Sequence, residues 1–322
     1  MEISELFDEI IDLAIQKKAS DIYFLPKSDN YEIKIHTSNG VIQLSELPFE
    51  KAQRVITYCK YRSGMAISEK RRPQLGAIMY TYQKQKFRFR LSSVGNFNQH
   101  ESLVLRIIYD NEQSGCRFFN ERKVEQLLNI ANKRGLMLFA GPTGSGKTTT
   151  IYKIARTLHE NEVVMAIEDP VEICEDRFLQ LEVNDKADMT YANLLKVGLR
   201  QRPDVFIIGE IRDSQTANIA VRAALSGHLV FSTVHAKTPQ GTIQRLLDLG
   251  VDKIQLKSAL TSVSYQRLLP TNNNSVKALI TICDDNPVDL NTDDMDDWKQ
   301  KLEDLFQNGE ITNETKKKYW YG

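Results

Sequence analysis

Apolar residues recur at helical spacing near the start of the chain and at alternate positions soon afterwards. Leu6, Ile10, Leu13 and Ala14 predict a helix with one buried face. The run "YEIKIHT" alternates apolar and polar side chains, and "SNG" turns the chain into "VIQL", which predicts a hairpin. A second helical pattern covers residues 49–62, and three strand-like runs follow, "GAIMYTY", "KFRFRLSSV" and "SLVLRII". Residues 1–109 are therefore expected to form a small α+β domain with an antiparallel sheet.

The pattern of apolar and polar residues changes after the polar stretch at residues 110–120, "DNEQSGCRFFN", which we interpret as a linker. Short apolar runs such as "LMLFA", "VVMAIED", "DVFIIGEI" and "HLVFSTV" then alternate with helical segments. This order is typical of an α/β domain with a parallel sheet covered on both faces, here over residues 121–270. Residues 271–322 are expected to be a partly helical carboxy-terminal extension. We interpret its acidic tail as a solvated helix, with a docking surface as the alternative.

The bulk composition narrows the possible classes of protein. The 322 residues carry 42 basic and 42 acidic side chains, so nothing favours general attraction to nucleic acid or to anionic lipid. Four cysteines lie far apart without a C-x-x-C pair, which is typical of a reduced intracellular protein and predicts neither disulfides nor zinc. The amino terminus lacks the pattern of a signal peptide, and no run of about 18 apolar residues predicts a membrane span. We therefore expect a cytoplasmic protein.

The stretch "GPTGSGKTTT" follows the apolar run "LMLFA" and precedes a helical pattern. It matches the phosphate-binding loop pattern G-x-x-x-x-G-K-[ST], in which glycines let backbone N–H groups converge on phosphate oxygens. Lys147 is expected to reach the β- and γ-phosphates and to contribute little to the core, and Thr148 to place its hydroxyl on Mg²⁺. The residues expected to bind the nucleotide are Gly141, Pro142, Thr143, Gly144, Ser145, Gly146, Lys147, Thr148 and Thr149.

Two further predicted strands end in carboxylates. The strand "DVFIIGEIRD" ends with Glu210, which would face the same crevice as Lys147 and could orient or activate the attacking water. The strand "VVMAIEDPVE" ends with Glu168 and Asp169, which could hold Mg²⁺ through water. Either Glu168 or Glu210 is a candidate for that role. The alternative for each is an ordinary acid at a strand end or in a turn.

Two histidines bracket the predicted strand "LVFSTV". An imidazole at His228 or His235 could sense the γ-phosphate and report its hydrolysis, whereas most histidines at strand ends bond only to backbone groups. It is the convergence of several such strand ends on one crevice that favours a catalytic interpretation.

Together these motifs resemble the secretion ATPases that drive type II secretion and type IV pilus assembly. The resemblance rests on "GPTGSGKTTT", "AIEDPVE", "LRQRPDVFIIGEIRD" and "SGHLVFSTVHA" in this order, with "ASDIYF", "SEKRRPQLG" and "FRLSS…ESLVLRII" before them. The short chain and the absence of a cysteine module make it most similar to the competence-pilus ATPases of Gram-positive DNA-uptake systems.

The resemblance implies a RecA-like P-loop ATPase domain preceded by a PAS-like α+β domain, assembled as a homo-hexamer. It implies ATP and Mg²⁺ as cofactors and a membrane platform protein that holds the ring at the inner face of the cell membrane. Assembly ATPases of this family usually carry a four-cysteine zinc module after the histidine box, but Cys283 stands alone in that region here, so no zinc is expected. The neutral net charge predicts no direct nucleic-acid binding. Arg90 and Arg106 match the arginines of the first domain that approach the phosphates. Lys196 and Arg202 stand where the family usually has Arg and Asp, which leaves roles inferred there open.

The sequence leaves several functions open. A pilus-assembly motor is favoured by "EDPVE" and "LSGHLV". A pilus-retraction ATPase, a nucleotide-gated scaffold with little turnover and a DNA motor remain alternatives. Intact Lys147 and Glu210 speak against the scaffold. The neutral charge and the lack of a basic-aromatic tract speak against the DNA motor.

Overall fold

The computed structural model divides the chain into two compact units, Met1–Asp110 and Asn111–Gly322. The residues that it describes are 2–37, 40–83, 85–109, 117–184, 187–236, 238–273, 275–284, 287–289 and 294–322. Residues 110–116 of the expected linker lie outside this described part, whereas Phe118 is buried in the core of the second unit.

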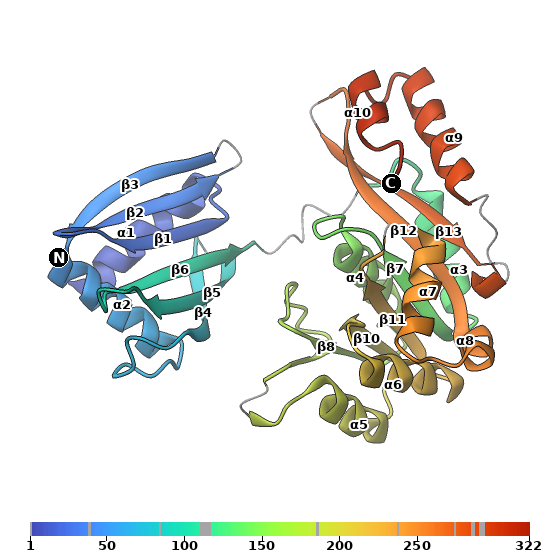
Figure 1. The fold of residues 1–322 in the computed structure, drawn as a ribbon, viewed down its shortest axis with the longest axis horizontal. Helices are drawn as coiled ribbons and strands as arrows, with labels where there is room; N and C mark the ends of the chain where they lie inside the picture. Colours follow the sequence, from blue (N-terminus) through green and yellow to red (C-terminus); the bar gives the residue numbers. More distant parts are fainter. Residues whose placement is uncertain are drawn as a thin grey trace. The chain divides into compact units, whose positions relative to one another are not determined.

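The first unit is a six-stranded antiparallel sheet with two helices packed on one face (Figure 1). The strand order is β3-β2-β1-β6-β5-β4. One apolar cluster joins the inward side chains of the strands to both helices. The elements in chain order are α1 (Ile3–Gln16), β1 (Asp21–Pro26), β2 (Asn30–Thr37), β3 (Gly40–Pro48), α2 (Phe49–Arg62), β4 (Gln74–Tyr82), β5 (Gln85–Gly95) and β6 (Glu101–Ile108).

Alternation along β5 and β6 decides which side chains point away from the helices. Phe89 and Leu91 are buried beneath the helices, so Arg90 between them lies on the other face of the sheet. Arg90 is directly opposite Arg106 in the register of β5 and β6. The Nε atom of Arg106 lies 2.8 Å from Oδ1 of Asp21, and the Arg106 side chain remains 64% exposed. Two guanidinium groups thus share one face of this sheet.

The second unit contains a seven-stranded sheet in the order β13-β12-β7-β11-β10-β8-β9. All neighbouring strands are parallel except β12 and β13, which pair antiparallel. The strands are β7 (Gly135–Ala140), β8 (Val164–Glu168), β9 (Leu179–Glu182), β10 (Val205–Glu210), β11 (Leu229–Val234), β12 (Leu260–Pro270) and β13 (Val276–Cys283). The α/β class with a largely parallel sheet is therefore as predicted.

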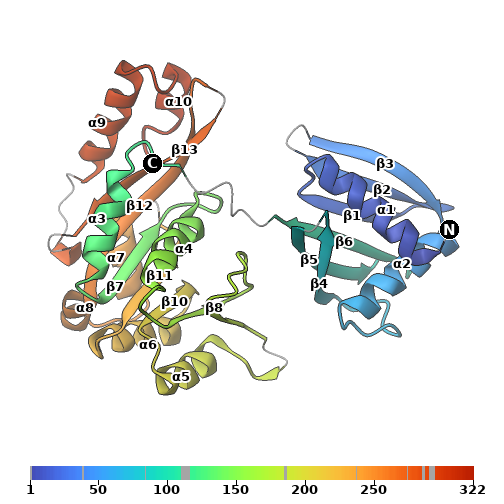
Figure 2. The same ribbon diagram turned by 180° about the vertical axis from the view of Figure 1, so that it is seen from behind.

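Helices cover both faces of this sheet. The cluster that contains α5, α6, α7 and α8 lies on one face, and the cluster that contains α3 and α4 lies on the other. Figure 1 shows α6, α7 and α8 in front of the strands, and the opposite view in Figure 2 brings α3 and α4 forward. The helices are α3 (Arg122–Ala131), α4 (Lys147–Leu158), α5 (Tyr191–Gln201), α6 (Ser214–Leu225), α7 (Pro239–Asp248), α8 (Lys253–Ala259), α9 (Asp294–Gln307) and α10 (Asn313–Lys318).

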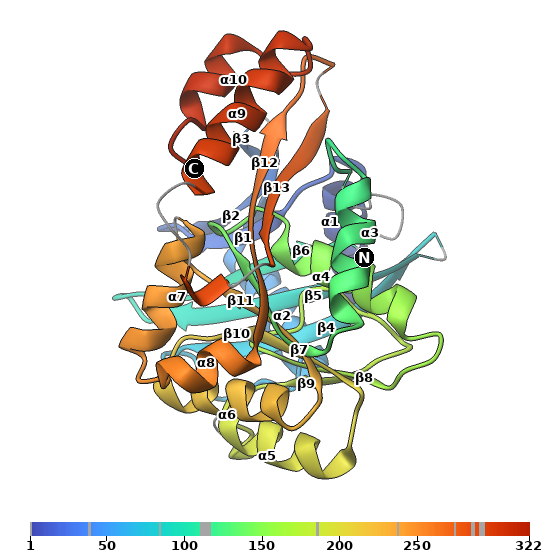
Figure 3. The same cartoon turned by 90° about the vertical axis from the view of Figure 1, so that its right-hand side faces the viewer.

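The carboxy-terminal part of the chain differs from the expectation. The boundary at residue 270 falls at the end of β12, and β13 beyond it is a strand of the same sheet. The acidic tail does form the helix α9, but Trp298 and Leu302 on it are buried against Tyr265, so this helix is not fully solvated. Figure 3 shows α9 and α10 beside the ends of β12 and β13.

Within the part of the chain that the structure describes, no helix combines the length and the apolar character needed to cross a membrane. Cys59 and Cys283 are buried and Cys174 is half-buried, whereas Cys116 lies outside the described residues.

Candidate active site

The loop between β7 and α4 has the backbone of a phosphate cradle. Gly141, Gly144 and Gly146 have φ angles of 139°, 76° and 82°, values that a residue with a Cβ atom rarely adopts. Gly146 also caps α4, so the free N–H groups of the first helical turn point towards the end of the strand. An anion at this position would meet both these donors and the positive end of the helix.

Lys147 is buried and bonded within the loop. Its Nζ atom donates to the carbonyl oxygens of Gly141 and Pro142, each at 2.9 Å. Burial lowers the pKa of Lys147, and the negative charges of Glu210 and Glu172 oppose that shift. The sequence predicts that this side chain contributes little to the core. Its two hydrogen bonds to loop carbonyl groups speak against that prediction, and the stability of a Lys147 variant tests it.

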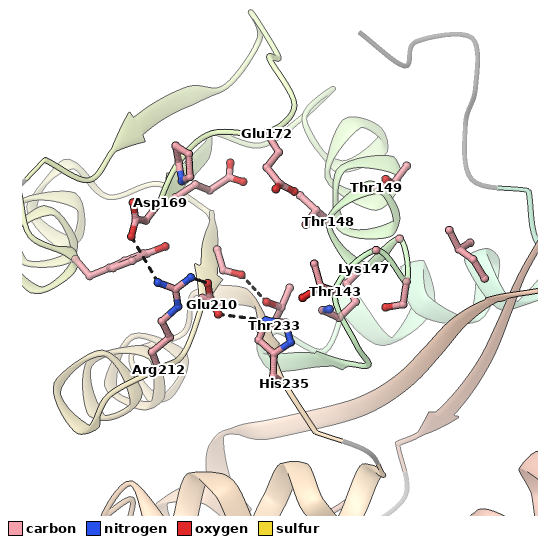
Figure 4. Close-up of a pocket in the computed structure, with 18 residues that line it drawn as sticks. Thr143, Lys147, Thr148, Thr149, Asp169, Glu172, Glu210, Arg212, Thr233 and His235 are labelled. Carbon is pink, nitrogen blue, oxygen red and sulfur yellow. Dashed lines mark hydrogen bonds and ion pairs between the residues drawn. The ribbon is translucent and has the colours of Figure 1, made fainter. Parts of the chain in front are cut away.

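A cavity of about 430 Å³ opens in front of the loop (Figure 4). Loop residues from Thr143 to Thr149 form one wall, and the carboxyl ends of β8, β10 and β11 form the other. Gly141 and Pro142, at the start of the loop, do not line the cavity. The remaining lining residues are Glu168, Asp169, Pro170, Glu172, Tyr191, Gly209, Glu210, Arg212, Thr233, His235 and Leu268.

Glu210 lies at the centre of a charged network at the end of β10. The guanidinium of Arg212 pairs with Glu210 and lies 3.7 Å from Oδ2 of Asp169. His235 approaches the other carboxylate oxygen with its Nε2 atom, at 3.4 Å. The hydrogen bond to Glu210 raises the pKa of Arg212, which therefore stays charged. Figure 4 shows Glu210 and His235 across the cavity from the loop that carries Lys147, so several carboxylates, two cations and an imidazole surround one space.

Glu168 is more deeply buried than Glu210. It accepts a hydrogen bond from the hydroxyl of Tyr152, and Gln180 donates to the same hydroxyl at 2.6 Å. Burial and the neighbouring Glu168 charge raise the pKa of Tyr152, which keeps this phenol protonated as a donor. Glu168 is therefore oriented by a side chain from α4, the helix that begins in the phosphate-binding loop.

Some residues of the cavity were not predicted from the sequence. Tyr191 borders it with its phenol, and burial together with the charge of Asp169 raises the pKa of that phenol. A Cβ atom at Gly209 would lie 3.0 Å from the Tyr191 hydroxyl, so this glycine makes room for it. Thr233 donates to the Gly209 carbonyl at 2.7 Å. Side chains alternate between the two faces of a strand, so Thr233, two residues before His235, could have been expected on the same side as His235.

The structure does not bring every candidate to this cavity. His228 lies before the amino end of β11, the end opposite to the cavity, where its Nδ1 atom is 3.1 Å from the Ala223 carbonyl and its ring packs on Phe206. A parallel strand has its two ends at opposite edges of the sheet, so only His235 of this pair lines the cavity. Lys196 and Arg202 are exposed on and just after α5, and neither lines the cavity. Arg90 and Arg106 belong to the first unit.

The hydroxyl of Ser145 gives further support for a phosphate in this loop. Ser145 is buried, and its Oγ atom has no hydrogen-bond partner among the described residues. A buried hydroxyl is costly unless it is bonded, and a phosphate oxygen in the loop would supply an acceptor. Within the described ranges, no group of three or more His, Cys, Asp or Glu side chains could hold a metal ion. The Thr148 hydroxyl beside the cradle fits a Mg²⁺ ion that is bound mainly by phosphate and water.

The chain is similar to known proteins over most of its length. The family described as "Type II/IV secretion system protein" matches residues 1–308. The competence protein ComGA of Streptococcus pneumoniae is 42% identical over 311 residues, which cover 97% of this chain and 96% of that protein. ComGA of Bacillus subtilis is 35% identical over 272 residues, covering 83% of this chain and 76% of that protein.

Two solved structures have the same fold. The pilus retraction motor PilT with bound ADP superimposes with a TM-score of 0.77 and 25% identity, covering 97% of this chain and 96% of PilT. The ATPase DotB of Legionella pneumophila superimposes with a TM-score of 0.75 over 97% of this chain and 94% of DotB. At 19% identity the second similarity shows the fold alone.

Proposed function

The chain belongs to the type II/IV secretion system protein family, and on this premise we propose that it is the ATP-hydrolysing motor that assembles a competence pilus for DNA uptake. The observation that carries the competence role is the match to the pneumococcal competence protein, which extends over nearly the full length of both chains. The chemistry rests on the cavity in which Lys147 and Glu210 line opposite walls.

The residues of the cavity divide the work of hydrolysis. When bound, Mg²⁺ would neutralise part of the charge of the phosphoryl group that passes from ATP to water. The loop N–H groups and Lys147 would bind the phosphates, and the Thr148 hydroxyl, with Glu168 or Glu210 through water, would hold the metal ion. Glu210 orients or activates the attacking water, with Arg212 and His235 fixing its carboxylate. Asp169 in turn helps to hold Arg212 in place.

We assign Arg90 and Arg106 to stabilisation of charge on the phosphates in an assembled ring. Their position side by side on one sheet face supports this role, since two guanidinium groups can bind phosphate oxygens bidentately. Removing either should lower kcat by about 10² or more, because an arginine that reaches the phosphates supplies on the order of 10³ to 10⁵.

Mixed rings test whether these arginines serve a neighbouring subunit. Arg90→Ala and Lys147→Ala proteins are each measured alone and then mixed. Hydrolysis that is partly restored on mixing indicates that Arg90 acts on the nucleotide of a neighbour, whereas no restoration indicates its own subunit. Full activity of both single arginine variants would contradict any role in phosphate binding.

The setting of the motor is also a proposal. A homo-hexamer, held at the inner face of the cell membrane by a polytopic platform protein, would transmit the conformational change to the pilus without binding nucleic acid directly. The first unit, an antiparallel sheet with helices on one face, supports the comparison with PAS domains. The second unit would be the RecA-like domain of that ring. Size-exclusion chromatography with light scattering, with and without ATP, measures the oligomeric state.

Retraction is the second candidate, because the superposition with the retraction motor PilT extends over both chains. Deleting the gene and counting surface pili separates the two functions. Loss of pili and of DNA uptake supports assembly, and an excess of pili supports retraction. Complementation with wild type and with Lys147→Ala shows whether the phenotype requires nucleotide. Phosphate release by the purified protein then excludes a scaffold without turnover.

A further inference from the structure

We propose that Gln266 on β12 is a positioning residue that sets the phosphate-binding backbone between Ser145 and Gly146. This inference rests on the proposed binding of ATP at the loop. Neither the loop motif nor the strand-end acids pointed to this residue, which is 121 positions away from Ser145 in the chain.

The side chain of Gln266 is fully buried and makes two hydrogen bonds. Its Nε2 atom donates to the carbonyl oxygen of Ser145 at 2.7 Å, and its Oε1 atom accepts from the hydroxyl of Thr150 at 2.8 Å. The orientation of the amide follows from chemistry, because a carbonyl oxygen can only accept and must therefore face the NH₂ group. The amide thus bridges the loop and the first turn of α4.

The bond to Ser145 determines where the next N–H group points. In a trans peptide the C=O and N–H bonds point in opposite directions. Because Gln266 holds the Ser145 carbonyl on the side of β12, the N–H of Gly146 points to the other side of the loop. The cavity lies on that side, because Ser145 and Gly146 line it whereas Gln266 does not. Gln266 therefore keeps one phosphate donor directed into the cavity.

The backbone of β12 supports the loop at a second point. A Cβ atom at Gly141 would lie only 2.4 Å from the carbonyl oxygen of Gln266. Glycine at this position therefore allows the strand to approach the loop closely, in addition to permitting its φ of 139°. With the carbonyl beside Gly141 and the amide on Ser145, one residue contacts the loop at two positions.

The expected effect is on affinity rather than on turnover. A loop N–H binds phosphate in the substrate and in the transition state alike, so its loss weakens both to a similar extent. Gln266→Met keeps the length and removes both hydrogen bonds. We expect this variant to bind ATP and ADP about tenfold more weakly, with KM raised in parallel and kcat within about threefold of wild type.

The experiment measures binding of a fluorescent ATP analogue and steady-state phosphate release for purified full-length variants. Gln74→Met is the matched control, since Gln74 is a buried glutamine that bonds the backbone of Ala66 and Glu69 in the first unit. It should leave nucleotide affinity unchanged. An affinity of Gln266→Met equal to wild type, or a fall in kcat with KM unchanged, would overturn the proposal.

A second pair of variants gives the same test if Gln266→Met does not fold. Thr150→Val removes the hydroxyl that holds Oε1 of Gln266, and Thr150→Ser keeps it. We expect Val to weaken binding several-fold and Ser to restore it, and equal affinities for the two would overturn the proposal. Wild-type protein that binds no ATP would instead contradict the proposed function itself.

Discussion

Replacing Glu210 by glutamine removes one negative charge from the cavity and keeps the shape of the side chain. The carboxylate is 15% exposed and is held by Arg212 and His235 on its two oxygens. The amide keeps an oxygen for Arg212, but it can no longer accept a proton from water. General-base assistance contributes about 10² to 10⁴ in rate. We therefore expect kcat to fall by at least about a hundredfold, or about 2.7 kcal/mol in activation free energy.

The same replacement should change folding stability little. The Arg212 side chain is 60% exposed, and an ion pair of that kind contributes about 0 to 1 kcal/mol. In a domain of this size that corresponds to at most about 4 °C in Tm. ATP affinity should survive, because the loop and Lys147 remain in place. The change thus separates hydrolysis from binding and from folding.

Phosphate release, nucleotide binding and thermal unfolding are measured on the same preparation. Glu172→Gln is the matched control, since Glu172 also lines the cavity and is exposed. It should keep kcat within a few-fold of wild type. The reasoning is refuted if Glu210→Gln retains near-normal turnover, or if both variants lose it equally, which would indicate a general effect of cavity charge. Loss of ATP binding would mean that Glu210 acts mainly as a ligand of the metal ion.

Three further predictions follow from the described contacts. Lys147→Ala should abolish ATP binding and phosphate release. It should also lower Tm by a few degrees, since the lysine bonds two loop carbonyls, and an unchanged Tm in differential scanning fluorimetry would contradict this role in stability. Ion pairs with Arg177 and Arg156 lower the pKa of Glu175 to about 2, so its stabilisation is present above the usual pKa near 4.5 and is lost as pH falls towards 2. Glu175→Gln should therefore lower Tm at pH 7, and the difference from wild type should vanish near pH 2. A chelator should leave Tm unchanged without nucleotide, and stoichiometric zinc in elemental analysis would contradict that expectation.

The sequence indicated the elements whose periodicity is regular. The helix around Leu6 and Ile10 and the strands that end at Ala140 and Glu210 have apolar residues at the spacing that their environment requires. The common edge of a parallel sheet then predicted that Lys147 and Glu210 would lie on one cavity, because the carboxyl ends of parallel strands lie at the same edge.

The parts that the sequence did not indicate are those in which tertiary contacts override the local pattern. β12 carries Ser262, Ser264 and Gln266 on a buried face, so its polar residues conceal an internal strand of the sheet. The acidic composition of α9 similarly conceals the apolar side that buries Trp298. The position of His228 was misjudged because the motif brackets a strand, and the two ends of a strand are at opposite edges of the sheet.

The adjacency of β7 and β12 has a consequence for the newly synthesised protein. The loop and the residue that supports it are 121 positions apart, and a ribosome adds about 5 to 20 residues per second, so the loop is made roughly ten seconds before Gln266. For most of this interval β7 lacks both of its neighbours in the sheet, because β11 and β12 both follow the loop in the chain. A nascent chain that stops before β12 would contain the entire phosphate-binding motif without the strand against which it packs. Tight capture of nucleotide is therefore expected to be a late event in the biosynthesis of this protein.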